Sequence, residues 1–438
     1  MKFGARSVML RCKKQPASLR HDGMTSTQMT HSLDHVDLFG ASLTVARTLI
    51  AAAVVFLTIV AAGATEPLEF KIGYLRVEKP RVAISLVAVP AENNGVAGAQ
   101  AAINDNNTTG KFLDQHFTLD DVKLKEGEDP AAAAAALADR GVSIVLADLP
   151  PDALLRAADA GRARGQVFFN VGAPDERLRE NDCRANVIHT APSRAMLADA
   201  LAQYLVWKQW KRWFLVVGSH EPDKLYADAL RRAATRFGAK IVGEKVFEDT
   251  GGSRRSDTGV VQVQRQIPVF TQQLPAYDVL VAADESEVFA GYLPYRTWDP
   301  RPVAGSAGLV PTSWDASNDQ WGATQMQDRF IREFKRPMTA LDMQAWTAVR
   351  MIGESAAHKR VNDPKALLDF IKSPDFALAA FKGQKLTLRD WNLQLRQPIL
   401  LTDGRTIVSV SPQEGFAHQF SELDTLGYDR SESKCKLQ

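Results

Sequence analysis

In the first part of the chain, segments with the hydrophobic pattern of strands alternate with segments with the pattern of helices. Residues 70–77, 142–147 and 166–171 are short apolar-rich runs, "FKIGYLRV", "VSIVLA" and "QVFFNV", of the kind that buried strands show. Residues 117–125 alternate in polarity and predict a further strand. Helical spacing predicts helices over 91–104, 129–140 and 151–164. The chain therefore opens with a β-α-β-α series.

A second series of the same kind begins after residue 190. Predicted helices at 193–208, 222–237 and 264–273 alternate with predicted strands at 213–217, 240–247 and 278–283, and another strand starts at 302–304. Two such series, joined by right-handed crossovers, predict an α/β fold with two Rossmann-like, doubly wound parallel-sheet lobes and a hinge between them.

The pattern changes after Gly308. Helices are predicted at 321–334, 340–358 and 364–371, followed by strand-like pieces at 385–391, 398–401 and 406–410. We expect this tail to cross back and complete both lobes. The expected division is a signal peptide and N-terminal extension at 1–64, lobe 1 at 65–188, lobe 2 at 189–330, and the completing helices and crossover tail at 331–438.

The apolar run 49–64, "LIAAAVVFLTIVAAGA", follows Arg47 and ends in small residues. This pattern is typical of a secretory signal with cleavage near Ala64, and the run is shorter than the roughly 20 residues that span a bilayer. A membrane anchor is the alternative, and Met24 or Met29 could be the true start. We expect an exported, periplasmic protein.

Export changes the charge of the chain. Seven of the 53 Lys and Arg residues and three of the 51 Asp and Glu residues precede residue 65, which leaves 46 basic and 48 acidic residues. The net charge of +2 would become −2. Because a phosphate-binding face needs a clear basic excess, this balance argues against nucleic acid as a partner.

Export also limits the roles open to cysteine. Cys12 would leave with the signal, so the exported chain would keep Cys183 and Cys435 only. We predict one disulfide between them, which would attach the polar tail to the body of the protein. Two free thiols are the alternative, and His189, six residues after Cys183, raises the further possibilities of a nucleophile with its base or half a metal site.

Motifs of catalysis and phosphate binding do not occur at the expected places. No G-x-G-x-x-G follows the first strand, and the sequence has no G-x-x-x-x-G-K-[ST], G-x-S-x-G, H-E-x-x-H or C-x-x-C. His189 has no neighbouring histidine or carboxylate at the spacing of metal ligands. We therefore predict a binding protein, neither an enzyme nor a metalloprotein, that needs no cofactor.

Ligands of doubly wound sheets lie at the carboxyl ends of the strands. The corresponding loops are 76–81, 148–151 and 171–175 in the first lobe and 220–226, 284–287 and 306–308 in the second. Their residues could contact a small molecule through backbone amides and side chains, or simply cap helices. The ligand-contact candidates are Arg81, Asp148, Pro150, Gly172, Ala173, His189, Tyr226, Asp284, Glu285 and Ala307.

Two tryptophans flank the strand that starts near residue 302. Trp298 and Trp314 could each stack on a flat ligand. Arg296 and Arg301 could pair with ligand carboxylates through their planar, bidentate donors, or form ion pairs between the lobes.

The whole exported chain resembles the type I periplasmic binding proteins, in the leucine/isoleucine/valine-receptor group of ABC transporter substrate-binding proteins. Four blocks, "YRTWDPRPVAGSAGLVP", "FKGQKLTLRDWNLQLRQPILL", "SPQEGFAHQF" and "TLGYDRSESKC", resemble one subfamily, which is encoded with PQQ-dependent alcohol dehydrogenase systems. The resemblance implies a monomeric, two-lobed protein that closes on a solute and offers it to an inner-membrane permease.

The sequence departs from the family where amino-acid-binding members carry small hydroxyl residues. The loop after 142–147 is "DLPP", and the loop after the first strand, "RVEKPR", lacks the usual Thr-Gly pattern. This disfavours a branched-chain amino acid. The association with PQQ enzymes suggests PQQ as a ligand rather than a cofactor, an alcohol-derived metabolite or a metal chelate. Arg81, Arg296, Trp298 and Trp314 could meet a planar tricarboxylate.

Two other functions are compatible with the sequence. The protein could be an accessory of the PQQ-dependent dehydrogenase, or a sensory module that reports ligand occupancy to a membrane partner. A neighbouring permease and ATPase would favour transport, whereas a histidine kinase would favour sensing.

Overall fold

The computed structural model describes residues 67–78, 90–125, 127–249 and 262–437. The predicted signal peptide lies outside these residues, and so does Arg81. Within the described part of the chain, no helix is both long enough and apolar enough to cross a membrane.

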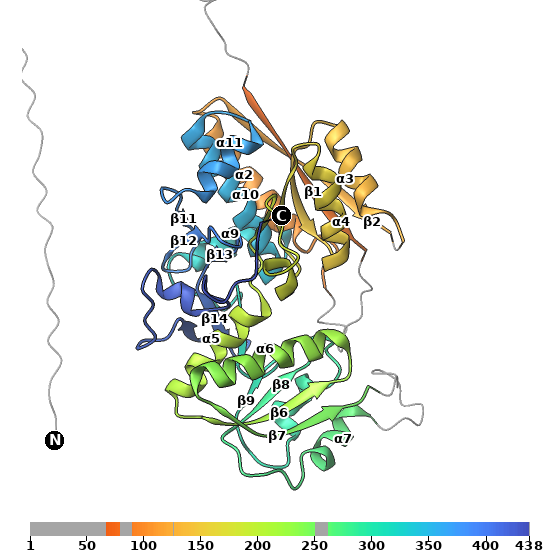
Figure 1. Cartoon of the computed structure of the whole chain (residues 1–438), viewed down its shortest axis with the longest axis vertical. Helices are drawn as coiled ribbons and strands as arrows, with labels where there is room; N and C mark the ends of the chain where they lie inside the picture. Colours follow the sequence, from red (N-terminus) through yellow and green to blue (C-terminus); the bar gives the residue numbers. More distant parts are fainter. Residues whose placement is uncertain (1–66, 79–89, 126, 250–261, 438) are drawn as a thin grey trace, which may run out of the picture. The chain divides into compact units, whose positions relative to one another are not determined.

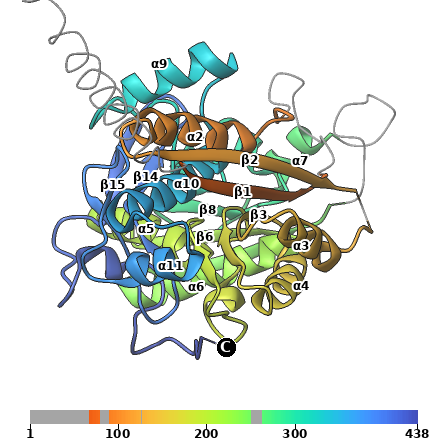
Figure 2. The ribbon, with the colours of Figure 1, turned by 90° about the horizontal axis from the view of Figure 1, so that it is seen from above.

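The first lobe is built on a five-stranded parallel sheet of order β2-β1-β3-β4-β5. Its strands are β1 (Leu68–Val77), β2 (Gln115–Leu124), β3 (Ile144–Asp148), β4 (Val167–Asn170) and β5 (Val187–His189). Figure 1 shows α3 (Pro130–Asp139) and α4 (Pro151–Arg162) on one face, and α2 (Val96–Gly110), α10 (Ala340–Lys359) and α11 (Pro364–Lys372) on the other. The view from above in Figure 2 agrees.

Alternate strand residues of this sheet enter two different cores. Ile72, Tyr74 and Leu146 pack with α2 and α10, whereas Leu75 and Val145 pack with α3 and α4. Helix α9 (Ala323–Phe334) also contributes to the core on the α10 side. Its residues therefore belong to the first lobe, and the expected end of lobe 2 at residue 330 is wrong.

The second lobe is built on a four-stranded parallel sheet of order β7-β6-β8-β9. Its strands are β6 (Arg212–Gly218), β7 (Lys240–Phe247), β8 (Val279–Ala283) and β9 (Val303–Gly305). Helices α5 (Arg194–Trp207) and α6 (Glu221–Phe237) pack on one core, and α7 (Val263–Phe270) and α8 (Leu293–Arg296) on the other. The predicted α/β fold with two doubly wound lobes is confirmed.

The tail adds short antiparallel pieces to both lobes. Strands β11 (Leu378–Ala379), β12 (Lys385–Leu388) and β13 (Leu395–Arg396) form one sheet, whose leucines enter the core of the first lobe. Strands β14 (Ile399–Thr402) and β15 (Ile407–Ser411) pair with β10 (Val310–Thr312) next to α5. The chain thus passes between the lobes three times, at 190–193, 313–322 and 397–398.

Helix α2 differs most from its prediction, because it begins and ends later than 91–104. Gly95, with φ at 81°, precedes its first turn, and its last turns contain the poor helix formers "NDNNTTG". Packing on α10 compensates: Asn106 donates to the carbonyl of Val349, and the backbone of Gly98 lies against that of Asp342. Tertiary contact therefore overrides local propensity here.

Candidate functional site

Both sheets have a topological switch point, which is the place between two adjacent strands whose following helices lie on opposite faces of the sheet. In the first sheet it lies between β1 and β3, and in the second between β6 and β8. Doubly wound folds bind their ligands in the crevice outside the carboxyl ends of such strands. At the first switch point Arg76 of β1 is in register with Asp148 of β3.

A pocket of about 240 Å³ opens at the first switch point. Its described walls come from the ends of β1, β2 and β3, from the segment before α2 and from α10; they are Arg76, Val77, Glu78, Pro90, Ala91, Glu92, Asn94, Lys123, Asp148 and Leu341. A pocket of about 650 Å³ adjoins it, shares Val77 and Glu78, and is lined by the first turns of α3 and α4, including Pro150.

Local sequence explains how the pocket groups are positioned. Asp148 ends the fully buried strand β3 and is 5% exposed. Gly172, after β4, leaves room for this carboxylate, since a Cβ at Gly172 would lie 2.4 Å from Asp148 Oδ1. Arg76 donates through Nε and Nη2 to both carboxylate oxygens of Asp121, at 2.9 and 2.7 Å. This bidentate pair fixes the guanidinium at the pocket wall.

At the carboxyl edge of the second sheet, the carboxylate of Asp284 is hydrogen-bonded within the protein. Asp284, directly after β8, accepts three backbone N–H groups, from Val288 at 2.9 Å and from Phe289 and Ala290 at 2.7 Å each. Its own N–H donates to Ser306 Oγ at 2.8 Å. Burial raises the pKa of the Asp284 carboxyl, and these backbone donors offset the rise. Asp284 therefore stabilises a turn. Because both of its carboxylate oxygens already accept backbone N–H groups, the structure disfavours the predicted contact of Asp284 with ligand.

Glu285 lies in an ion-pair cluster at the start of α5. Arg194, whose side chain is 6% exposed, donates to Glu285 Oε2 at 2.7 Å and lies 3.2 Å from Asp175 Oδ1 of the first lobe. Burial raises the pKa of Glu285, and Arg194 counteracts this rise. Tyr226 is buried next to Glu285, and burial raises the pKa of its hydroxyl. The cluster links the two lobes.

His189 and Ala173 lie in a buried polar network at the first crossing segment. Asn170 Nδ2 contacts His189 Nδ1 at 3.0 Å, and Arg179 Nη1 donates to the carbonyl of Ala173 at 2.8 Å. Burial, together with the Arg179 guanidinium, lowers the pKa of His189 well below its ordinary value, so the ring is neutral. His189, a predicted ligand contact, is 1% exposed and belongs to this buried network.

The two tryptophans do not form the platform that the sequence suggests. Trp314 is 2% exposed and belongs to the core of the first lobe. Trp298 is 60% exposed, but it precedes β9 and its N–H donates to Thr271 at the end of α7. Trp298, and with it Arg296, is therefore at the amino edge of the second sheet, opposite the carboxyl ends. Ala307 is buried in the core between that sheet and α7.

The structure also reveals residues that the sequence did not single out. Arg76, Glu92, Asn94 and Lys123 line the switch-point pocket, and Arg194 joins Asp175 to Glu285. The run 76–81 pointed toward the first of them. The others are brought together from distant parts of the chain, and no local pattern marks that approach.

Cys183 and Cys435 are joined by a disulfide across 252 residues of sequence, with their Cα atoms 5.6 Å apart. The predicted pairing is confirmed. It removes the nucleophile interpretation of Cys183, because neither sulfur is a thiol. In the described part of the chain no group of three or more His, Cys, Asp or Glu side chains could hold a metal ion.

Comparison with known proteins identifies the fold. The family model described as "Periplasmic binding protein" matches residues 85–257. A search of curated proteins found no match. Solved structures match across most of the chain, and at identities below 20% they establish the fold.

One similar structure is a periplasmic binding protein from Burkholderia mallei, with 14% identity, a TM-score of 0.62, and 84% of this chain and 99% of that chain covered. Another is a branched chain amino acid ABC transporter periplasmic ligand-binding protein from Burkholderia xenovorans, with 18% identity, a TM-score of 0.63 and the same coverage. A third is an ABC transporter solute binding protein from R. palustris in complex with benzoate, with 11% identity, a TM-score of 0.59, and 84% and 100% covered.

The predicted resemblance is thus confirmed at the level of the type I periplasmic binding protein fold. The proteins matched are binding proteins by name, in agreement with the prediction that this chain is not an enzyme.

Proposed function

We propose that this chain is the periplasmic solute-binding component of an ABC transporter, which holds a small molecule at the carboxyl edges of its two sheets and presents it to an inner-membrane permease. The observation that carries the proposal is the pocket at the β1/β3 switch point of a fold shared with periplasmic binding proteins over 84% of the chain. The solute would shift an equilibrium between open and closed lobes, by no more than its difference in affinity for the two states.

The two edges would contribute differently to binding. Charged side chains of the first edge line the switch-point pocket, whereas Asp284 of the second edge is held by backbone N–H groups of its own turn, and we infer that the first edge supplies the polar groups that select the solute. Similar structures were solved with benzoate, with Leu and with isoleucine, which are small organic molecules. The volumes of about 240 and 650 Å³ at the first edge suit solutes of this class.

Charge at the pocket bears on the ligand. The described lining of the 240 Å³ pocket contains two bases, Arg76 and Lys123, and three acids, Glu78, Glu92 and Asp148. Arg76 and Lys123 are themselves paired with carboxylates of the protein. A polar solute without surplus negative charge matches these residues better than a tricarboxylate does.

The link to a PQQ-dependent alcohol dehydrogenase system remains a prediction from the sequence blocks. Within such a system, an alcohol-derived metabolite suits the described pocket better than PQQ, since none of Arg296, Trp298 and Trp314 lines it. We expect PQQ to produce neither tryptophan quenching nor thermal stabilisation. Clear saturable quenching by PQQ would reverse this choice of ligand.

Native mass spectrometry of protein isolated from its own periplasm tests the proposal. We expect a retained small molecule, and we expect the released molecule to raise the melting temperature of stripped protein. Asp148→Asn should change its affinity by about tenfold, since the lost charge faces the pocket. The matched control Asp375→Asn removes an exposed carboxylate between α11 and β11 that does not line the pocket, and it should change nothing. Equal effects of the two variants would contradict the location of the site.

A further inference from the structure

The C-terminal segment, residues 423–435, lies across the junction of the two lobes and contacts them in alternation. We name this segment the C-terminal strap. Beginning near η4 (Glu422–Thr425), it runs to the disulfide at Cys435. Its contacts with each lobe are specific and partly buried, so it differs from an ordinary frayed terminus.

The strap contacts the second lobe through Asp199 of α5, which is fully buried. Asp199 Oδ2 accepts the N–H of Gly427 at 2.8 Å and also pairs with Arg232 and Arg236 of α6, at 3.0 and 2.6 Å. The Arg232 guanidinium lies 4.0 Å from the centre of the Tyr428 ring. Arg232 Nη2 also donates to Glu432 of the strap at 3.1 Å.

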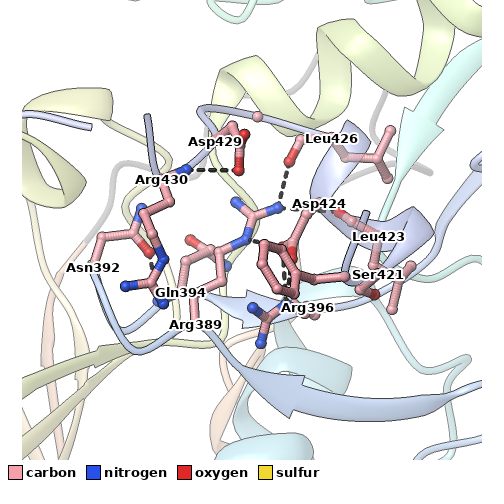
Figure 3. A network of polar contacts seen from close by, with 12 residues as sticks. Arg389, Asn392, Gln394, Arg396, Ser421, Leu423, Asp424, Leu426, Asp429 and Arg430 are labelled. Atoms are coloured by element: carbon pink, nitrogen blue, oxygen red, sulfur yellow. Dashed lines mark hydrogen bonds and ion pairs between the residues drawn. The ribbon is translucent and has the colours of Figure 1, made fainter. Parts of the chain in front are cut away.

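The strap contacts the first lobe at its two ends and once between them. Figure 3 shows Arg389 and Arg396, from either side of the β12–β13 turn, converging on Asp424. Arg389 and Asp424 are each 1% exposed, and Arg389 Nη2 donates to the carbonyls of Leu423 and Leu426 at 3.0 and 2.7 Å. Further along the strap, Arg430 pairs with Asp390 beside the same turn.

The far end of the strap is bound to the segment that precedes β5. Glu180 accepts the N–H of Lys434 at 2.6 Å, and Cys435 forms the disulfide with Cys183, which is 1% exposed. A pocket of about 620 Å³ is lined by the strap and both lobes. Its walls include Tyr428 and Lys434 of the strap, Glu176 and Arg177 of the first lobe, and Leu225 and Asp228 of α6.

We propose that the disulfide-closed C-terminal strap is a fourth connection between the lobes and limits how far they separate. Glu432, which is attached to α6, and Cys435, which is attached to the first lobe, are three residues apart. An extended chain spans at most about 3.6 Å per residue, so the Cα atoms of Glu432 and Cys435 can lie at most roughly 11 Å apart. Wider opening must break the pair between Glu432 and Arg232 of α6, because the disulfide holds the other end of this span.

The limit that the C-terminal strap places on lobe separation does not depend on which solute is bound. It rests on the two-lobed fold and on contacts present without ligand, so its failure would leave the proposed transport function standing. Conversely, loss of the strap is expected to change lobe motion even in protein stripped of small molecules.

Hydrogen exchange and small-angle scattering of ligand-free, full-length exported protein test the proposal. The Cys183→Ser/Cys435→Ser variant should show a larger radius of gyration than the oxidised protein. Its crossing segments at 190–193 and 397–398 should exchange about threefold faster or more, whereas the centres of β3 and β8 should keep their protection. Unchanged crossing segments, with faster exchange confined to 423–437, would overturn the proposal.

A second variant covers the case in which loss of the disulfide unfolds the protein, which lost protection in β3 and β8 would reveal. Arg430→Gln/Glu432→Gln keeps the disulfide and removes one attachment to each lobe. We expect a smaller increase in exchange at the same crossing segments. The control, Lys365→Gln/Asp369→Gln, removes an exposed pair on α11 and should leave those segments unchanged. Identical crossing-segment exchange in this strap variant and this control would overturn the proposal.

Discussion

Two aspartates occupy matching places in the two lobes and serve different ends. Asp148 is the last residue of β3, and Asp284 directly follows β8, the strand beside the switch point of the other sheet. Both are buried. The side chain of Asp148 lines a pocket, whereas the carboxylate of Asp284 accepts hydrogen bonds from three backbone N–H groups of its own loop. The same residue after the same kind of strand is thus a candidate ligand group in one lobe and a structural cap in the other.

Different residues follow the two aspartates. Asp148 is followed by Leu149, Pro150 and Pro151, and neither proline has a backbone N–H. After Asp284 the chain turns without proline into η3 (Ala290–Tyr292), so that successive amides point back at the side chain. The turn after β8 thus supplies backbone donors to its aspartate, whereas the side chain of Asp148 is seen to line a pocket.

Removal of the structural carboxylate should have the largest effect. Asp284→Ala leaves three backbone N–H groups without their acceptor, and each buried unsatisfied donor costs about 1–3 kcal/mol, so we expect a loss of about 3–5 kcal/mol in the free energy of unfolding. Asp148→Asn keeps the shape of its side chain and should cost less than about 1 kcal/mol. Urea unfolding of both variants measures the difference, and equal losses would erase the contrast between the two aspartates.

A buried lysine extends the comparison to a basic side chain that is hydrogen-bonded to an amide oxygen. Lys382 is 2% exposed, its Nζ donates to Gln397 Oε1 at 2.5 Å, and burial lowers its pKa from 10.5 to about 7. Between pH 7 and 10 the unfolded chain holds this proton and the folded chain does not. Stability should therefore rise with pH across this range, by up to about 1.4 kcal/mol per unit.

Unfolding measurements at pH 7, 8 and 9 check the sign of this dependence. Lys382→Met should remove the slope, since the titrating group is gone. Lys365→Met, which removes an exposed ammonium paired with Asp369, is the control and should keep the slope of the unchanged protein. A wild-type stability that falls over this range would show that Lys382 keeps its proton in the folded state.

The smallest effects are expected at the amino edge of the second sheet. Trp298→Ala and Arg296→Gln alter exposed side chains away from the carboxyl ends. We expect each to change stability by no more than about 0.5 kcal/mol. Isothermal titration with the molecule released from the native protein should give affinities within twofold of the unchanged protein. A clear loss of affinity would move the site to the opposite edge of the sheet.

The sequence predicts the scaffold well because the scaffold is repetitive. Apolar runs of six residues, such as 142–147 and 278–283, are typical of strands buried on both faces, and their alternation with helices favours a parallel sheet. Boundaries fail where packing overrides propensity, as at the Asn-rich end of α2. The disulfide was predictable because loss of Cys12 with the predicted signal peptide would leave only Cys183 and Cys435.

The site is less predictable, for a physical reason. Loops at carboxyl ends can be located from periodicity, but the pairing of each side chain depends on residues far away in sequence. Trp314 enters a core and Arg194 finds Glu285 ninety-one positions later. Asp148 and Asp284 look alike in the sequence, and only the folded chain shows that the first lines a pocket and that the second accepts three backbone N–H groups. Exposure and pairing, which decide availability to a ligand, are therefore properties of the folded chain.

Hydrogen exchange locates the bound solute when protein isolated with its small molecule is compared with the same protein stripped in guanidinium and refolded. We expect the small molecule to protect residues 76–78, 90–95 and 148–153 at the first switch point, with weaker protection at 219–223 and 284–286. Protection confined to 293–302, at the amino edge of the second sheet, would contradict a site at the carboxyl edges.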